Sequence, residues 1–130
     1  NELKKFNTHD GMSFKILREK GIKSAIITSE ETNIVKMRSK KLNVDYLYQS
    51  VSGNNKLDVI KQICIKENIQ LSEVAYIGDD INDLEALSAV GLAACPNNAT
   101  QKIKNIEKII RLKKSGGDGA VREFVEIILK

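Results

Sequence analysis

The sequence predicts an α/β protein of three layers, in which a parallel sheet carries helices on both faces. Short apolar runs alternate with amphipathic stretches along the whole chain, and strand-like runs return about every 20–30 residues, which is typical of strand–helix–strand units. The 130 residues, 42% hydrophobic and 29% charged, are enough for one globular domain with its own core. We therefore expect a single domain over residues 1–130.

The first half of the chain shows four elements in order. From Gly11 to Lys20 apolar residues fall on one helical face, and Gly21 follows as a C-cap. The continuous apolar run Ser24–Thr28 is of the buried-strand type. Glu31–Leu42 has the periodicity of a helix with a basic outer face, and Val44–Tyr48 alternates like a strand.

The second half continues the alternation. Val74–Ile77 is its clearest buried strand, because four apolar or aromatic residues are stopped by Gly78. Periodicity and turn residues place the other elements as helices at Leu57–Asn68, Asn82–Val90 and Ala120–Leu129, and as strands at Gly91–Ala94 and within Asn105–Leu112.

Charge and composition narrow the range of partners. The 21 Lys and Arg exceed the 17 Asp and Glu, so the net charge is +4, and it is spread along the chain. This excess suits an anionic small molecule, whereas the absence of Trp and an aromatic content of 5% argue against nucleic acid. No apolar run approaches the roughly 20 residues that span a bilayer. No secretory signal is visible, so no membrane association and a cytoplasmic location are expected.

The two cysteines predict no metal or redox site. Cys64 and Cys95 have neither metal-ligand nor CxxC spacing. We expect them to be small buried residues with free thiols, as in a reducing compartment.

Acidic side chains cluster directly after the clearest predicted strand, in the run Gly78–Asp83. Asp79, Asp80 and Asp83 would repel one another without a nearby cation, and oxygen ligands of this kind suit Mg²⁺. Helix capping is the alternative, because Asp80 or Asn82 could cap the helix that follows. Capping accounts for one or two polar residues, whereas this run has four, namely Asp79, Asp80, Asn82 and Asp83. A metal site is therefore favoured.

Other loops carry candidate groups for an anionic ligand. Thr28 and Ser29 stand at a strand end, where a hydroxyl can donate to a phosphoryl oxygen; N-capping of the next helix is the alternative. Lys56 lies at a helix start, which the helix dipole disfavours for a cation, so either an anion lies nearby or the lysine is solvated. Asp10, beside the only histidine (His9), is a candidate local contact to substrate.

In their order on successive strand ends, Thr28, Lys56 and the run Gly78–Asp83 resemble a haloacid dehalogenase-type phosphohydrolase. The similarity is greatest to the small capless branch that includes the 3-deoxy-manno-octulosonate 8-phosphate phosphatases and the phosphatase-like domains of acylneuraminate cytidylyltransferases. The segments that carry it are Phe6–Gly11, Ala25–Thr28, Val74–Asp80 and Gly116–Glu123. The resemblance implies a Rossmann-like, three-layer α/β/α fold without a large cap domain.

The resemblance implies a role for each matching residue. Thr28 would bind the phosphoryl group, and Lys56 would neutralise charge on the phosphoryl oxygens and on the nucleophile. Asp79 would be a Mg²⁺ ligand and Asp80 a second one, direct or through water. Asp83 would orient Lys56.

The substrate implied by the resemblance is a phosphorylated acidic keto-sugar. The segment Gly116–Arg122 resembles a C-terminal tail that enters the active site of a neighbouring subunit in a tetramer, where Arg122 would meet the substrate carboxylate. A homotetramer is therefore expected. At the first strand end the octulosonate phosphatases usually carry Gly-Arg, whereas this chain has Ser29 and Glu30. Glu30, with Lys41 eleven residues on, is more like the nonulosonate 9-phosphate phosphatases, which favours a nine-carbon substrate.

The largest departure from the family is an absence. The family's chemistry starts from an Asp-x-Asp pair at the end of its first strand, whose first Asp takes the phosphoryl group and whose second acts as general acid and base. No Asp-x-Asp precedes Lys5. We therefore expect the domain to be N-terminally incomplete, with the central strand of its sheet missing and the 130-residue chain inactive by itself.

Three functions stay open at this point. The first is a Mg²⁺-dependent phosphomonoesterase that acts on an octulosonate 8-phosphate or nonulosonate 9-phosphate through an aspartyl-phosphate. The second is a non-catalytic oligomerisation module of an acylneuraminate cytidylyltransferase, and the third is a phosphate-binding module without hydrolysis. The intact run Asp79–Asp83 argues against complete loss of metal chemistry, so the first is favoured.

Overall fold

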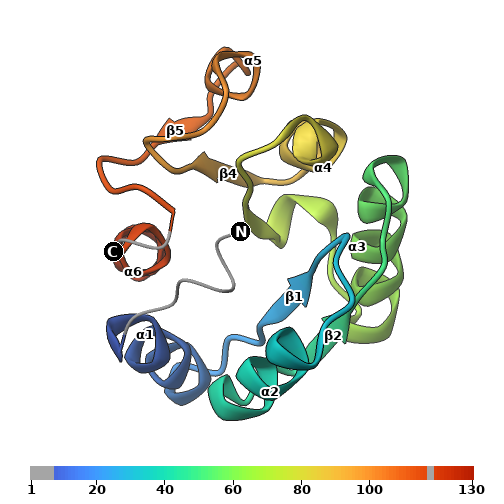
Figure 1. Ribbon diagram of the computed structural model, residues 1–130, viewed down its shortest axis with the longest axis vertical. Coiled ribbons are helices and arrows are strands. Elements are labelled where there is room, and N and C mark those ends of the chain that lie inside the picture. Colours follow the sequence, from blue (N-terminus) through green and yellow to red (C-terminus); the bar gives the residue numbers. More distant parts are fainter. Residues whose placement is uncertain (1–7, 117–118) are drawn as a thin grey trace.

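The computed structural model describes residues 8–116 and 119–130, which form an α/β fold of parallel strands joined by helices (Figure 1). Along the chain the elements are α1 (Thr8–Glu19), β1 (Ala25–Ile27), α2 (Asn33–Leu42), β2 (Tyr46–Tyr48), α3 (Gly53–Glu67), η2 (Leu71–Glu73), β3 (Ala75–Ile77), η3 (Ile81–Asp83), α4 (Leu84–Ala89), β4 (Leu92–Cys95), α5 (Gln101–Lys104), β5 (Ile110–Arg111) and α6 (Ala120–Ile128). The predicted fold class is confirmed.

The strands of the described residues form two parallel sheets. One has the order β1-β2, with Ala25 opposite Tyr46, and the other has the order β3-β4-β5, with Ala75 opposite Leu92. Figure 1 shows the two groups of strands apart from each other. The sequence analysis predicted one sheet with its central strand missing, and no strand within residues 8–116 or 119–130 joins β1 to β3.

Local signals explain where the helices end. Gly21 has φ +76 after α1, as its expected C-cap role requires, and Asn43 and Asn68 take the same left-handed conformation after α2 and α3. Thr32 caps α2 by accepting a hydrogen bond from Val35 N, so this helix begins at Asn33 and not at Glu31. The predicted helix Asn82–Val90 is divided into the short 3₁₀ turn η3 and α4.

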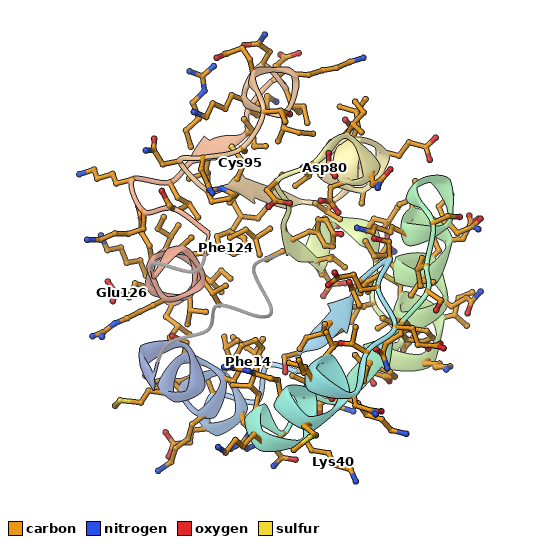
Figure 2. All side chains as sticks on the ribbon, in the orientation of Figure 1. Phe14, Lys40, Asp80, Cys95, Phe124 and Glu126 are labelled. Carbon is orange, nitrogen blue, oxygen red and sulfur yellow. The ribbon has the colours of Figure 1, made fainter. Side chains whose placement is uncertain are left out.

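Packing between elements builds the core around both sheets. Helix α1 packs against α6 and α2, and α3 packs against α4 and η3. In Figure 2, Phe14 of α1 and Phe124 of α6 point inward, whereas Lys40 and Glu126 point away from the molecule. Some of the buried residues form three clusters: Leu87, Cys95, Ala99 and Ile103; Ala94, Leu112, Ala120 and Phe124; and Ile60, Cys64 and Ala86.

Both cysteines are buried and free, as predicted. Burial raises the pKa of the Cys64 and Cys95 thiols, so they stay protonated and are poor nucleophiles. Among the described residues, no helix combines the length and the apolar character needed to cross a membrane.

Candidate active site

The polar residues singled out from the sequence stand at the carboxyl ends of three strands. Thr28 directly follows β1, Lys56 lies in the first turn of α3 after β2, and Asp79 and Asp80 follow β3 within three residues. Figure 2 places Asp80 beside α4, at the edge where β3 ends. Ligands of open parallel sheets bind outside the carboxyl ends of the strands, so these residues mark the candidate site.

A buried ion pair joins α3 to the loop after β3. Nζ of Lys56 lies 3.0 Å from Oδ1 of Asp83, and the two side chains are only 9% and 6% exposed. The dipole at the start of α3 disfavours a cation, and burying an unpaired charge costs several kcal/mol, so the Asp83 carboxylate offsets both effects. The alternative of a solvated Lys56 is therefore wrong.

Asp83 accepts hydrogen bonds on both of its oxygens. Oδ1 accepts from Lys56 Nζ and, at 2.6 Å, from the Tyr76 hydroxyl. Oδ2 accepts from the backbone N–H groups of Asp79 at 3.2 Å and Asp80 at 3.3 Å. Asp83 is thus engaged with donors of its own chain, and it fixes the loop that presents the other two carboxylates.

Gly78 makes room for this arrangement. A Cβ at position 78 would lie 2.6 Å from Cβ and Cγ of Asp83 and 2.8 Å from its Oδ2. These separations are far inside van der Waals contact, so any side chain at position 78 would displace the Asp83 carboxylate. A glycine is required here because the Asp83 side chain comes so close to the backbone of position 78. The sequence pattern had predicted only that Gly78 ends the strand.

Asp79 and Asp80 have the chemistry of magnesium ligands. Asp79 is half-buried and Asp80 exposed, and Asp80 Oδ1 also accepts from Ile81 N at 2.7 Å, so Asp80 caps η3 as the alternative interpretation proposed. Mg²⁺ takes one or two protein carboxylates and completes its shell with water and phosphate oxygens, which fits this donor pair. Within residues 8–116 and 119–130 no three His, Cys, Asp or Glu side chains are grouped to hold a metal ion by themselves.

Thr28 presents a buried hydroxyl at the end of β1. Its side-chain oxygen accepts a hydrogen bond from Glu30 N at 3.1 Å, which leaves the hydroxyl hydrogen available for a phosphoryl oxygen. Its backbone is held from both sides, because Thr28 N donates to Tyr48 O and Val51 N donates to Thr28 O, each at 3.0 Å. The cap of α2 is Thr32, so the capping alternative for Thr28 and Ser29 is wrong.

Comparison with known proteins identifies the family. The sequence profile of the haloacid dehalogenase-like hydrolases matches residues 46–124, more than half of the chain. The chain belongs to the haloacid dehalogenase-like hydrolases. This membership confirms the predicted family.

Relatives place the chain within the capless branch of this family. It is similar to the 3-deoxy-D-manno-octulosonate 8-phosphate phosphatases of Yersinia pestis and Escherichia coli K12, each 35% identical over 129 residues and 98% of this chain. The chain spans 67% and 66% of these two proteins, or about two thirds of their length.

Solved structures agree with this placement. The phosphatase of Moraxella catarrhalis, in complex with a magnesium ion, a phosphate ion and a KDO molecule, has a TM-score of 0.88 and 35% identity, covering 95% of this chain and 70% of that one. The phosphatase of Yersinia pestis has a TM-score of 0.89 and 32% identity, covering 95% of this chain and 65% of that one.

The predicted substrate residues Lys41, Glu30, Ser29 and Asp10 stand in different parts of the molecule. Lys41 is exposed in the last turn of α2, nine residue steps or about 13 Å of helix rise from Thr32, the N-cap residue. Glu30 lies half-buried and Ser29 exposed beside Thr28. Asp10 belongs to α1, and its side chain is outside the described part of the molecule.

Arg122 lies on the outer side of α6 in this chain. Its Nε is 3.1 Å from Glu126 Oε1, and its side chain is 49% exposed. Ala120 and Phe124 are buried in their own chain, so the residues from Ala120 onward form a packed helix and not an extended tail. Gly117 and Asp118, within the expected tail, are outside the described residues, and contact of Arg122 with a neighbouring subunit stays a prediction.

The sequence interpretation missed Tyr76, whose hydroxyl contacts Asp83. A signal for it was present, because a tyrosine in a buried strand needs a partner for its hydroxyl, and the acidic run begins three residues later. Periodicity alone counted Tyr76 as an apolar strand residue.

Proposed function

We propose that this chain carries the phosphate-binding and metal-binding part of a Mg²⁺-dependent phosphatase that hydrolyses a phosphorylated acidic keto-sugar. The single observation that carries the proposal is the buried Lys56–Asp83 pair, since Asp79 and Asp80 stand in the loop of Asp83 and Thr28 stands at the carboxyl end of β1. A buried ammonium beside a hydroxyl and two oxygen ligands for a cation forms a receptor for a phosphoryl group. Membership of a hydrolase family and the phosphatase relatives support it.

Each residue has a defined part in binding the phosphoryl group. Lys56 directs one N–H toward Asp83, and its other two N–H groups can donate to phosphoryl oxygens, on which negative charge builds during transfer. Thr28 supplies a further hydroxyl donor. Asp79 and Asp80 would hold Mg²⁺, which supplies neutralisation of phosphoryl charge when bound.

The group that accepts the phosphoryl is proposed to lie in an Asp-x-Asp segment outside these 130 residues. Its first carboxylate attacks phosphorus while the P–O bond to the sugar breaks, and its second donates a proton to the departing sugar oxygen. Water then cleaves the aspartyl-phosphate and returns inorganic phosphate. The placement of β1 and β3 in separate sheets supports this, because a parallel strand inserted between them would end beside Thr28 and Asp79.

The eight-carbon 3-deoxy-octulosonate 8-phosphate is the proposed substrate. The relatives similar over 98% of this chain are named for it. The nine-carbon alternative depended on Glu30 together with Lys41, and of these two only Glu30 lies beside Thr28, whereas Lys41 stands in the last turn of α2. Like its relatives' substrate, the ligand is a small molecule, and a homotetramer remains the proposed assembly.

Phosphate release from a panel of sugar phosphates tests the proposal. The full-length protein with Mg²⁺ is expected to hydrolyse 3-deoxy-octulosonate 8-phosphate faster than a nonulosonate 9-phosphate, and Asp79→Asn is expected to lose activity. Phosphate release from the nonulosonate 9-phosphate alone would make the nine-carbon ester the substrate in place of the eight-carbon one. No release from any keto-sugar phosphate would overturn the phosphatase and leave the binding or oligomerisation modules.

A further inference from the structure

Tyr76, the middle residue of β3, connects the core to the site. Its ring is half-buried and packs against the cluster around Leu87 and Cys95 and against the cluster around Ile60. Its hydroxyl donates to Asp83 Oδ1 at 2.6 Å. Because the ring is packed on two sides, the sheet holds this donor in one place.

The oxygen that Tyr76 contacts is the one that holds Lys56. Nζ of Lys56 donates to the same Oδ1 at 3.0 Å, so the two donors share the lone pairs of one atom. The other oxygen is held by two backbone N–H groups of the loop. Four donors therefore fix the carboxylate in rotation, and the hydroxyl restricts the direction from which the ammonium can approach.

We propose that Tyr76 is a positioning residue of this site: its hydroxyl holds the Asp83 carboxylate so that the Lys56 ammonium stays directed at the phosphoryl group. The inference rests on the proposed phosphatase function. A lysine is a flexible point charge with three donors. Without the hydroxyl, Oδ1 is left to the ammonium alone, which then turns toward Asp83 and away from the ligand.

Tyr76→Phe tests this directly, because it removes the hydroxyl and keeps the packed ring. In the full-length protein we expect kcat on the keto-sugar phosphate to fall roughly 5- to 30-fold while KM changes less than about twofold, because the Lys56 charge matters most as charge builds in the transition state. Tyr48→Phe is the matched control, since the Tyr48 hydroxyl accepts from exposed Lys66 outside the site. Unchanged kcat in Tyr76→Phe would overturn the proposal, even if the variant melts earlier.

A double-mutant cycle with Asp83→Asn checks the route of the effect. If Tyr76 acts through Asp83, the double variant should have the kcat of Asp83→Asn alone. Two losses that multiply would show that Tyr76 acts elsewhere and would overturn the positioning role.

A readout independent of turnover separates this inference from the proposed function. The backbone amide resonances of Asp79 and Asp80 should shift in Tyr76→Phe and stay in place in Tyr48→Phe, because both amides donate to Asp83. If the unmodified protein releases no phosphate, the phosphatase proposal fails. The amide resonances of Asp79 and Asp80 then test by themselves whether Tyr76 holds Asp83. Shifts then support the hold of Tyr76 on Asp83, and unshifted resonances overturn it.

Discussion

At the scale of single residues, the site depends on position 78 being a glycine, because there is no room for a side chain there. Substitution with Ala would place a methyl group 2.6 Å from Asp83 Cβ and Cγ, so the carboxylate must leave its four donors. We expect Gly78→Ala to lower the free energy of unfolding by about 2–4 kcal/mol, measured by urea denaturation.

Gly21→Ala is the matched control for this substitution. Gly21 has φ +76, and no atom lies within 4 Å of the position that a Cβ would take there, so only backbone strain is added, which costs about 1 kcal/mol. Equal losses in the two variants would show that the contact of position 78 with Asp83 is unimportant.

Tyr46 gives the folded state a dependence on alkaline pH. Its hydrogen bond to Glu67 raises the pKa of Tyr46 to about 12, and the same bond, followed by that from Lys23, lowers the pKa of Glu67. The folded state holds the Tyr46 proton more tightly than the unfolded chain does. The contribution of this bond is therefore complete below pH 10 and is lost as the pH rises toward 12.

Urea midpoints between pH 9 and 12 test this dependence. The stability of the unmodified protein and of the control Tyr48→Phe is expected to fall as Tyr46 loses its proton. Tyr46→Phe has no such proton, so its stability is expected to lack this decline. A parallel decline in all three proteins would assign the loss to other groups.

At the scale of elements, α6 is anchored by Glu123. Its carboxylate accepts from the backbone N–H of Lys113 at 3.0 Å and of Lys114 at 2.9 Å. We expect Glu123→Gln to cost about 1–2 kcal/mol of stability, because the acceptor loses its charge and only one oxygen can still accept from the loop. Glu126→Gln, which removes only an exposed pair with Arg122, should cost about 0.5 kcal/mol or less. Thermal unfolding of both variants tests this prediction. Equal decreases in their unfolding temperatures would show that Glu123 does not anchor α6.

Most elements could be predicted because each is signalled locally. The strand at Ala75–Ile77 and the C-cap at Gly21 follow from a short apolar run and a glycine after a periodic stretch. The short helix α5 was missed, since four residues are too few for a periodicity. The separation of β1-β2 from β3-β4-β5 agrees with the expected absence of a central strand, which came from the resemblance, because local patterns do not signal strand pairing.

The candidate site was predictable to the extent that it lies at strand ends. Topology brings Lys56 and Asp83 together across 27 residues, as the resemblance implied. Tyr76 was not predictable by the same logic, because it lies inside a strand. Lys41 was assigned by resemblance alone, and the length of α2 carries it away from Thr28.

At the scale of the whole molecule, we expect the 130-residue chain by itself to hydrolyse no keto-sugar phosphate, because the proposed nucleophile is outside it. A longer protein that includes the Asp-x-Asp segment should release phosphate with Mg²⁺ and stop when EDTA is added. Phosphate release assays on both proteins test this. Turnover by the 130-residue chain that disappears in Asp79→Asn would contradict it and require another nucleophile.

The Lys56–Asp83 pair also has a consequence for folding kinetics. Lys56 belongs to the helix that follows the β1-β2 sheet, and Asp83 to the turn that follows the first strand of the β3-β4-β5 sheet. A partly folded chain with only one sheet therefore has no ion pair. Its two charges lose their water only when both halves dock. We expect this long-range docking to come late in folding, so that the pair acts mainly by slowing the escape from the native state and not by speeding its formation.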